Sequence, residues 1–230
     1  MYDADDKIVE AASFRTMPEH QWRGSEEGDQ EAKENLVSAN RDSRPVVEND
    51  REENAAKQAE SQLASGNNHE IVDVKEGDQF IRMTSKDDRG TSAYFTKESE
   101  IKDISYLDNK GQLHIDEDAY RDRFAIPSES KLERCETYTA KKDFKTQKSE
   151  VAGSTEHFGR TNHGGGGTQY IIPDRKDKLG EHPDSVCDVK CHDSERFQDA
   201  KTAMRESAAH RQNHVQDKEQ TKEQKMERSI

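Results

Sequence analysis

Gln169 is the residue whose setting in the chain most strongly indicates a chemical role. Four consecutive glycines, Gly164–Gly167, run directly into Thr168–Ile172, a short apolar segment that Pro173 closes. Glycine tolerates backbone angles that other residues cannot adopt, so such a run either lets the main chain approach a ligand or serves only as a linker. Because the segment after it alternates like a strand, we expect Gln169 to be held rigidly at the end of the glycine loop.

Several segments before the glycine run carry further residues suited to ligand binding. In chain order they are Arg82, Gly90–Thr96, Arg121–Pro127, Glu150–Gly153 and His157–Gly159. Taken singly, each has an ordinary structural explanation: Arg82 is also typical of a solvent-facing strand position, and Ser92 of a turn exit. The order of all these segments together, rather than any one of them, favours an enzyme.

The three cysteines, Cys135, Cys187 and Cys191, are too few and odd in number for a disulfide framework, which fits a reducing compartment. Cys187, Cys191 and His192 lie close enough together for zinc to be considered, with His182 just upstream. The spacing is not the usual two-residue gap, and a fourth ligand from a turn of its own is missing. We therefore expect no metal site and interpret the thiols as solvated.

Composition limits the classes of partner. The net charge of −13 argues against broad affinity for nucleic acid or anionic membranes, since both require a basic surface. No apolar run of about 18 residues is present, so no membrane-spanning helix is expected. Residues Met1–Asp6 lack the basic and apolar regions of a secretory signal. If the protein leaves its cell, we expect a route that does not use such a signal.

Composition also divides the chain into three parts. Residues 1–70 are acidic and sparse in apolar side chains, which predicts a solvated helical or disordered arm. Residues 71–175 hold most of the aromatic and branched side chains and are the predicted folded domain. Residues 176–230 are predicted to be a charged loop and a helical tail, either solvated or partner-binding. Within the domain we expect a short helix over 116–123 and strands over 80–84, 91–96, 135–140, 150–152 and 168–172.

The ordered set of segments resembles the ADP-ribosyltransferase-like toxin domains. It is most similar to the necrotising-toxin class of NAD glycohydrolases, found at the C-termini of polymorphic toxins. In that class a strand ending in a short Val-Gly segment leads through a Phe-Gly step to a glycine-rich loop and Thr-Gln-Tyr. The most specific part of the match runs from Val151 to Ile172, and the resemblance covers roughly residues 78–173, under half of the chain.

The resemblance implies an α+β fold, a split and mostly antiparallel β-sheet with few short helices and a nicotinamide-binding cleft. It implies NAD as substrate rather than as cofactor, a cognate immunity protein as partner, and action in a target-cell cytoplasm. Gln169 would sit at the anomeric carbon of the nicotinamide ribose and orient the attacking water, and Arg82 would hold the pyrophosphate. The residues to which the resemblance gives substrate binding are Arg82, Ser92, Tyr94, Phe95, Arg123, Gly166, Gly167 and Thr168. Among them, Tyr94 and Phe95 would form an aromatic wall, and the glycine loop would offer main-chain N–H groups.

The sequence departs from that class at three places. No Phe-Gly step follows Arg82, Arg121 competes with Arg123 for the family arginine, and the family histidine has no counterpart in Tyr138–Ala140. His157 and His163 either replace that histidine or are solvated loop residues. Transferases of this fold usually carry Glu where this chain has Gln169, which favours hydrolysis. Protein mono-ADP-ribosylation remains one alternative, and a non-catalytic module that binds a partner through its helical tails is another.

Overall fold

A computed structural model describes residues 26–43, 51–88, 92–156 and 161–206 of the chain. Its helices are α1 (Glu26–Ser43), α2 (Arg51–Leu63), α3 (Glu117–Phe124), α4 (Arg175–Lys178) and the 3-10 helix η1 (Glu98–Ile101), and residues 194–206 are also helical. The strands are β1 (Gly66–Val74), β2 (Gln79–Thr84), β3 (Tyr94–Phe95), β4 (Ser105–Leu107), β5 (Leu113–Asp116), β6 (Arg134–Thr139), β7 (Phe144–Val151), β8 (Ser154–Glu156), β9 (Thr161–His163), β10 (Thr168–Ile171) and β11 (Ser185–His192). No described helix is long and apolar enough to cross a membrane.

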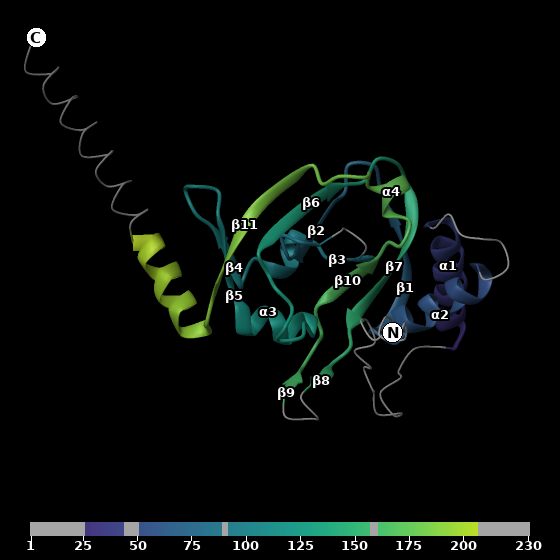
Figure 1. The fold of residues 1–230 in the computed structure, drawn as a ribbon, viewed down its shortest axis with the longest axis horizontal. Coiled ribbons are helices and arrows are strands. Elements are labelled where there is room, and N and C mark those ends of the chain that lie inside the picture. The colour runs from purple at the N-terminus through teal and green to yellow at the C-terminus, as the bar shows by residue number, and fades with distance from the viewer. Residues whose placement is uncertain (1–25, 44–50, 89–91, 157–160, 207–230) are drawn as a thin grey trace, which may run out of the picture.

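In the described ranges, the strands form two sheets and a small hairpin (Figure 1). One sheet has the strand order β1-β7-β10-β3 and is antiparallel throughout. The other has the order β2-β6-β11-β5-β4, in which β11 runs parallel to β5 and the remaining pairs are antiparallel. The predicted α+β class with a mostly antiparallel sheet core is confirmed.

A single β-bridge joins β2 to the end of β3, so the two sheets meet there. The N–H of Ile81 donates to the carbonyl of Thr96 at 2.8 Å, and the N–H of Thr96 donates back to the carbonyl of Ile81 at 2.9 Å. The bridge places Arg82, which follows Ile81, beside the strand that carries Tyr94 and Phe95. Residues that lie 12 or 13 positions apart in the sequence therefore become neighbours at the junction of the two sheets.

Strand β7 is longer than the sequence predicted. It begins at Phe144 rather than near Glu150, and its interior positions Thr146, Gln147 and Ser149 are all buried. Polar side chains at buried positions conceal the alternation that predicts a strand. The strand is nonetheless fixed by pairing on both sides, with β1 and with β10.

The predicted boundary of the folded domain at residue 175 is wrong, because β11 lies at the centre of the five-stranded sheet between β6 and β5. Its charged sequence was interpreted as part of a loop, yet the strand pairs along both edges. The fold continues into the helix over 194–206, where Phe197 is fully buried and its ring centroid lies 5.6 Å from that of Tyr106. The rest of the predicted tail lies outside the described residues.

The expectation of a solvated N-terminal arm is wrong for α1 and α2. The two helices pack against each other and against the four-stranded sheet (Figure 1), burying a small cluster formed by Ala32, Leu36, Ala59, Leu63 and Ile171. Alanine-rich contacts let the helices approach closely with few large apolar residues, which is why the sequence looks too polar to be buried. Residues 1–25 of the predicted arm lie outside the described residues.

Helix α3 confirms the helix predicted over 116–123. Asp116 caps its first turn by accepting a hydrogen bond from the N–H of Ala119 at 3.1 Å. The helix ends at Ala125, whose φ of 48° places it in the left-handed region. This end of α3 is where the glycine loop packs, so the helix boundary helps to position the segment that leads into Gln169.

Candidate active site

A cavity of about 550 Å³ lies where the two sheets and α2 meet. Five residues predicted to form a site line it together: Arg82, Ser92, Tyr94, Phe95 and Gln169. The volume falls within the range of roughly 300–1,000 Å³ found for small-molecule sites. Residues from β2, the segment around β3, and β10 therefore converge on one space.

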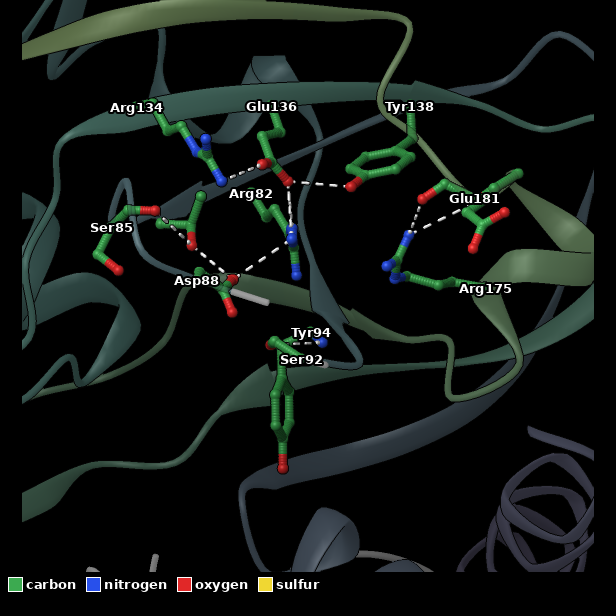
Figure 2. Close-up of polar contacts among 12 residues, drawn as sticks. Arg82, Ser85, Asp88, Ser92, Tyr94, Arg134, Glu136, Tyr138, Arg175 and Glu181 are labelled. Carbon is green, nitrogen blue, oxygen red and sulfur yellow. Dashed lines mark hydrogen bonds and ion pairs between the residues drawn. The ribbon is translucent and has the colours of Figure 1, made fainter. Parts of the chain in front are cut away.

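Arg82 is held in the cavity wall by carboxylates (Figure 2). Its Nε donates to Oε2 of Glu136 at 2.8 Å, and its Nη2 lies 2.7 Å from the same oxygen and 3.3 Å from Oδ2 of Asp88. The side chains of Arg82 and Glu136 are only 4% and 5% exposed. Glu136 is held in turn by Arg134 at 3.2 Å and by the hydroxyl of Tyr138 at 2.9 Å. The cluster fixes the guanidinium and offsets its charge.

One donor atom of Arg82 is left over. Its Nη1 is buried and has no hydrogen-bond partner among the residues that the structure describes. The guanidinium carbon also lies 6.0 Å from the ring centroid of Phe95 and 5.7 Å from that of Tyr138. A buried donor without an acceptor costs about 1–3 kcal/mol, so most such groups in proteins have a partner. A ligand acceptor in the cavity would satisfy this atom.

Gln169 is fixed by its amide nitrogen. The residue is 5% exposed, and its Nε2 donates to the carbonyl of Ser65 at 3.1 Å, to Oγ of Ser65 at 3.0 Å and to Oγ of Ser149 at 3.1 Å. Its Oε1 accepts no hydrogen bond from the described residues. The side chain is therefore held by one end, and its carbonyl oxygen remains available to a ligand or a water molecule.

Ser65 and Gly66, which position Gln169, are not among the site residues predicted from the sequence. Ser65 follows α2, and its hydroxyl donates to the carbonyl of Gln62 at 2.6 Å. At Gly66, a Cβ atom would lie 2.4 Å from Oγ of Ser149 and 2.8 Å from Nε2 of Gln169, so no larger residue fits. The sequence alone does not show this role of Gly66, because its closeness to Ser149 depends on the pairing between β1 and β7.

The two predicted aromatic residues occupy different environments in the cavity wall. Phe95 is 2% exposed and meets Tyr138 edge to face at a centroid distance of 5.5 Å. Tyr94 is partly exposed, and its N–H donates to Oγ of Ser92 at 3.3 Å. Tyr94 thus offers more of its surface to a ligand, whereas Phe95 mainly supports the guanidinium of Arg82.

No protein-family model and no curated protein matches the chain. Among solved structures, the chain is similar to Rhs1-CT in complex with cognate immunity protein RhsI1, at 18% identity and a TM-score of 0.34, over 53% of this chain and 81% of that one. It is also similar to Tse6 in complex with Tsi6, at 10% identity and a TM-score of 0.36, over 66% of this chain and 95% of that one. Likenesses at these TM-scores assign neither a family nor an activity to the chain.

The glycine loop does not face the cavity with free amides, as the sequence led us to expect. The N–H of Gly165 donates to the carbonyl of Asp122, that of Gly166 to Val151 and that of Gly167 to Arg123, at 2.8, 2.8 and 3.0 Å. The N–H groups of Gly164 and Thr168 donate to the carboxylates of Asp122 and Glu100, at 2.6 and 3.3 Å. The predicted role of Gly166, Gly167 and Thr168 as amide donors to substrate is therefore wrong.

The loop needs its glycines for conformation and close packing instead. Gly165 and Gly166 have φ angles of 74° and 88°, which L-residues other than glycine rarely adopt. A Cβ on Gly165 would lie 2.4 Å from the carbonyl oxygen of Val151, whereas one on Gly166 would meet nothing within 4 Å. The loop joins β9 to β10, and its contacts with Val151 and α3 set the position at which the strand of Gln169 begins.

Arg123 does not line the cavity. Its Nη1 and Nη2 form a bidentate ion pair with the carboxylate of Asp103, at 2.7 and 2.6 Å. Nη1 also donates to the carbonyl of Glu100 at 2.5 Å. The hydrogen bond from Arg123 lowers the pKa of Asp103 below its ordinary value. The competing Arg121 is held by Glu117 at 2.7 Å and by backbone carbonyls. Both arginines act within the fold.

Among the described residues, the histidines and cysteines singled out in the sequence do not line the cavity. His157 lies outside the described residues, and His163 is on β9 away from the lining. His192 contacts His114, with Nε2 and Nδ1 2.8 Å apart, while the thiol of Cys191 donates to the carbonyl of Leu132 at 3.4 Å. Within the described ranges, no three His, Cys, Asp or Glu side chains are grouped to hold a metal ion.

Proposed function

We propose that the cavity binds NAD and hydrolyses its nicotinamide–ribose bond, giving nicotinamide and ADP-ribose. One observation carries the proposal: residues named from the sequence on three separate segments line one cavity, and Nη1 of Arg82 and Oε1 of Gln169 have no hydrogen-bond partner among the described residues. An unsatisfied donor and an available acceptor in a partly apolar space are the features expected of a ligand site.

Arg82 would bind a phosphate oxygen of NAD through Nη1. Its Nε and Nη2 already contact Glu136 and Asp88, so the guanidinium can donate to the phosphate through Nη1 but cannot bind it in a bidentate manner. The acidic partners offset its charge, which makes direction rather than net charge its main contribution to binding. We therefore expect Arg82 to position the substrate.

Gln169 would act at the reacting carbon. The bond between nicotinamide nitrogen and ribose carbon breaks while positive charge develops on the ribose ring, and a water oxygen then bonds to that carbon and loses a proton to solvent. Nicotinamide leaves as a neutral molecule, so a strong general acid is not required. With Nε2 bound to Ser65 and Ser149, Oε1 of Gln169 would accept from a ribose hydroxyl or from the attacking water and fix its geometry.

As part of the same proposal, the protein acts as a toxin or effector with a cognate immunity protein as its partner. Cleavage of NAD depletes a metabolite that every cell needs, so the activity is harmful in any cytoplasm that the protein enters. A route that does not use a secretory signal would deliver it. These statements rest on the sequence resemblance, and a search for a neighbouring gene product that binds the chain and blocks turnover tests them.

The test is to mix the purified protein with NAD and follow nicotinamide and ADP-ribose by chromatography. The proposal predicts free ADP-ribose from the parent and none from Gln169→Ala. Gln147→Ala is the matched control, because Gln147 is a fully buried glutamine on the adjacent strand that does not line the cavity. Label transferred to a protein would favour mono-ADP-ribosylation, and neither turnover nor binding of NAD would favour an interaction module.

A further inference from the structure

Two cysteines face each other across neighbouring strands of the five-stranded sheet. Cys135 on β6 and Cys187 on β11 are direct partners in an antiparallel register, and β6 and β11 lie side by side in Figure 1. Residues directly opposite in such a pair have Cα atoms about 4.5–5.5 Å apart. A disulfide spans Cα separations of roughly 4.4–6.8 Å, so the backbone already has the spacing of a disulfide. Both thiols are free in this structure.

The two thiols differ in exposure and in acidity. Cys135 is 4% exposed, whereas Cys187 is only partly buried and open to a small reagent. A hydrogen bond from the thiol of Cys135 lowers the pKa of Cys187 to about 7. The same contact, together with burial, raises the pKa of Cys135. Because the thiolate is the reactive form of cysteine, the more exposed member of the pair is also the better nucleophile.

The third cysteine provides an internal comparison. Cys191 lies on the same strand as Cys187, but its register partner on β5 is Ile115. Its thiol donates to the carbonyl of Leu132 at 3.4 Å, and burial raises its pKa to about 11. Cys191 therefore has neither a facing cysteine nor the acidity that would make it react.

We propose that Cys187 and Cys135 form a dithiol modification site that a low-molecular-weight disulfide oxidises to a disulfide within the chain. The Cys187 thiolate attacks one sulfur of the small disulfide, forming a mixed disulfide and releasing one thiolate. The Cys135 sulfur then attacks the Cys187 sulfur, forming the bond between the two residues and releasing the second small thiol. The two protein thiols are oxidised, and the small disulfide is reduced to two thiols.

The disulfide would link β6, which supports the candidate site, to β11, which leads into the C-terminal part of the fold. Strand β6 holds Glu136, which fixes Arg82, and β11 leads into the helix over 194–206. Closing a loop of about 50 residues restricts the unfolded chain, so the oxidised form should be the more stable one. A protein that passes from an oxidising to a reducing compartment would lose this cross-link on arrival.

The experiment uses the full chain and glutathione disulfide as the probe. Free thiols are counted by alkylation and mass spectrometry, and linked peptides are mapped after digestion. We expect the parent to fall from three free thiols to one, with Cys135 linked to Cys187, and its Tm to rise by roughly 5–10 °C. Cys191→Ser should form the same link, whereas Cys187→Ser should form none.

The parent unfolded in urea is the control, since it shows whether glutathione disulfide can oxidise the cysteines when they are fully accessible. The proposal is overturned if the folded parent keeps three thiols while the unfolded chain is oxidised. It is also overturned if glutathione stays attached to Cys187 of the parent, or if the link in the parent involves Cys191. A linked parent that unfolds at the same temperature as the reduced parent would overturn it as well. The second variant is Cys135→Ala, because a serine at this buried position would leave a buried hydroxyl. In Cys135→Ala the reaction should stop at the mixed disulfide on Cys187.

Discussion

The glycine loop and the cluster around Arg82 both border the region of Gln169, yet they use their polar groups in opposite ways. In the loop, the N–H groups of Gly164 to Thr168 all donate to acceptors of α3, β7 and η1. Around Arg82, two carboxylates take Nε and Nη2, and Nη1 is left without a partner among the described residues. A fully satisfied loop can position a neighbour, but only an unsatisfied group is ready to bind a ligand.

The difference assigns separate tasks to the two regions. The loop sets the start of β10 and so the place of Gln169, while Arg82 lines the cavity and keeps a buried donor without a partner among the described residues. Changes in the loop should therefore act through stability and the geometry of Gln169. Changes at Arg82 should act on substrate binding as well as on stability.

The largest effect on stability is expected at Arg82. Arg82→Met removes the main partner of Glu136 and leaves a buried carboxylate, which should lower the free energy of unfolding by about 3–5 kcal/mol. The measurement is urea unfolding at neutral pH. Arg134→Met is the matched control, since Arg134 contacts the same carboxylate but is 26% exposed, and it should cost about 1 kcal/mol. Equal losses in the two variants would contradict the central place given to Arg82.

Within the loop, Gly165→Ala should be more harmful than Gly166→Ala. Both positions have positive φ angles, which cost an alanine about 1–2 kcal/mol. Only Gly165 would in addition bring a Cβ atom to 2.4 Å from a backbone oxygen. We expect losses of about 3 kcal/mol for Gly165→Ala and about 1 kcal/mol for Gly166→Ala in urea unfolding. A reversed order would show that packing against Val151 does not hold the loop.

Gly66→Ala tests the support of Gln169 from the other side. The new Cβ would meet Oγ of Ser149 and Nε2 of Gln169, so the amide must move. Misplacement of a reacting group by about 1 Å can cost up to 10²-fold in rate, and we expect NAD turnover to fall by about 10- to 100-fold. Steady-state kinetics measures this, and a circular dichroism spectrum equal to the parent's verifies the fold. Unchanged turnover in Gly66→Ala would contradict the role given to Gly66 and Ser149 in positioning Gln169.

The smallest effect is expected at the ion pair between Arg123 and Asp103. Because Arg123 lowers the pKa of Asp103, the pair stabilises the folded state above the unfolded value of 3.8, and this stabilisation is lost as the pH falls through that region. Asp103 is 63% exposed, so screening limits the effect to about 0.2–1 kcal/mol. Asp103→Asn should therefore be slightly less stable than the parent at pH 7, and the difference should shrink in acid. If Asp103→Asn instead changes the KM for NAD, Arg123 would have to be counted among the substrate-binding residues.

The sequence predicted the residues of the cavity better than it predicted their roles. Strands β2 and β10 and helix α3 follow from local patterns, and Arg82 and Gln169 were named on them. The amides of the glycine loop were misjudged because their acceptors lie on α3 and β7, which are distant in the chain. Glu136, the main partner of Arg82, was missed for the same reason. No local pattern shows that Glu136 pairs with Arg82 across the sheet.

The long-range pairings also explain what was missed at the two ends of the domain. Ser65 and Gly66 lie about 100 residues before Gln169, and the pairing of β1 with β7 and of β7 with β10 is what brings them beside its side chain. The sequence analysis assigned β11 to the charged loop and tail. Its place in the sheet depends on pairing with β6 and β5 rather than on its own apolar content. Local composition cannot report such contacts.

The most direct test of the account is a steady-state comparison of Gln169→Ala and Arg82→Lys with NAD as substrate. The account predicts that Gln169→Ala lowers kcat by at least about 10²-fold with little change in KM, because the amide acts on the transition state. Arg82→Lys keeps the charge near Glu136 but loses the Nη1 donor, so it should raise KM by about 10-fold with kcat largely kept. A parent that releases no nicotinamide, or variants that both match the parent, would contradict the assignment of the cavity as an NAD site.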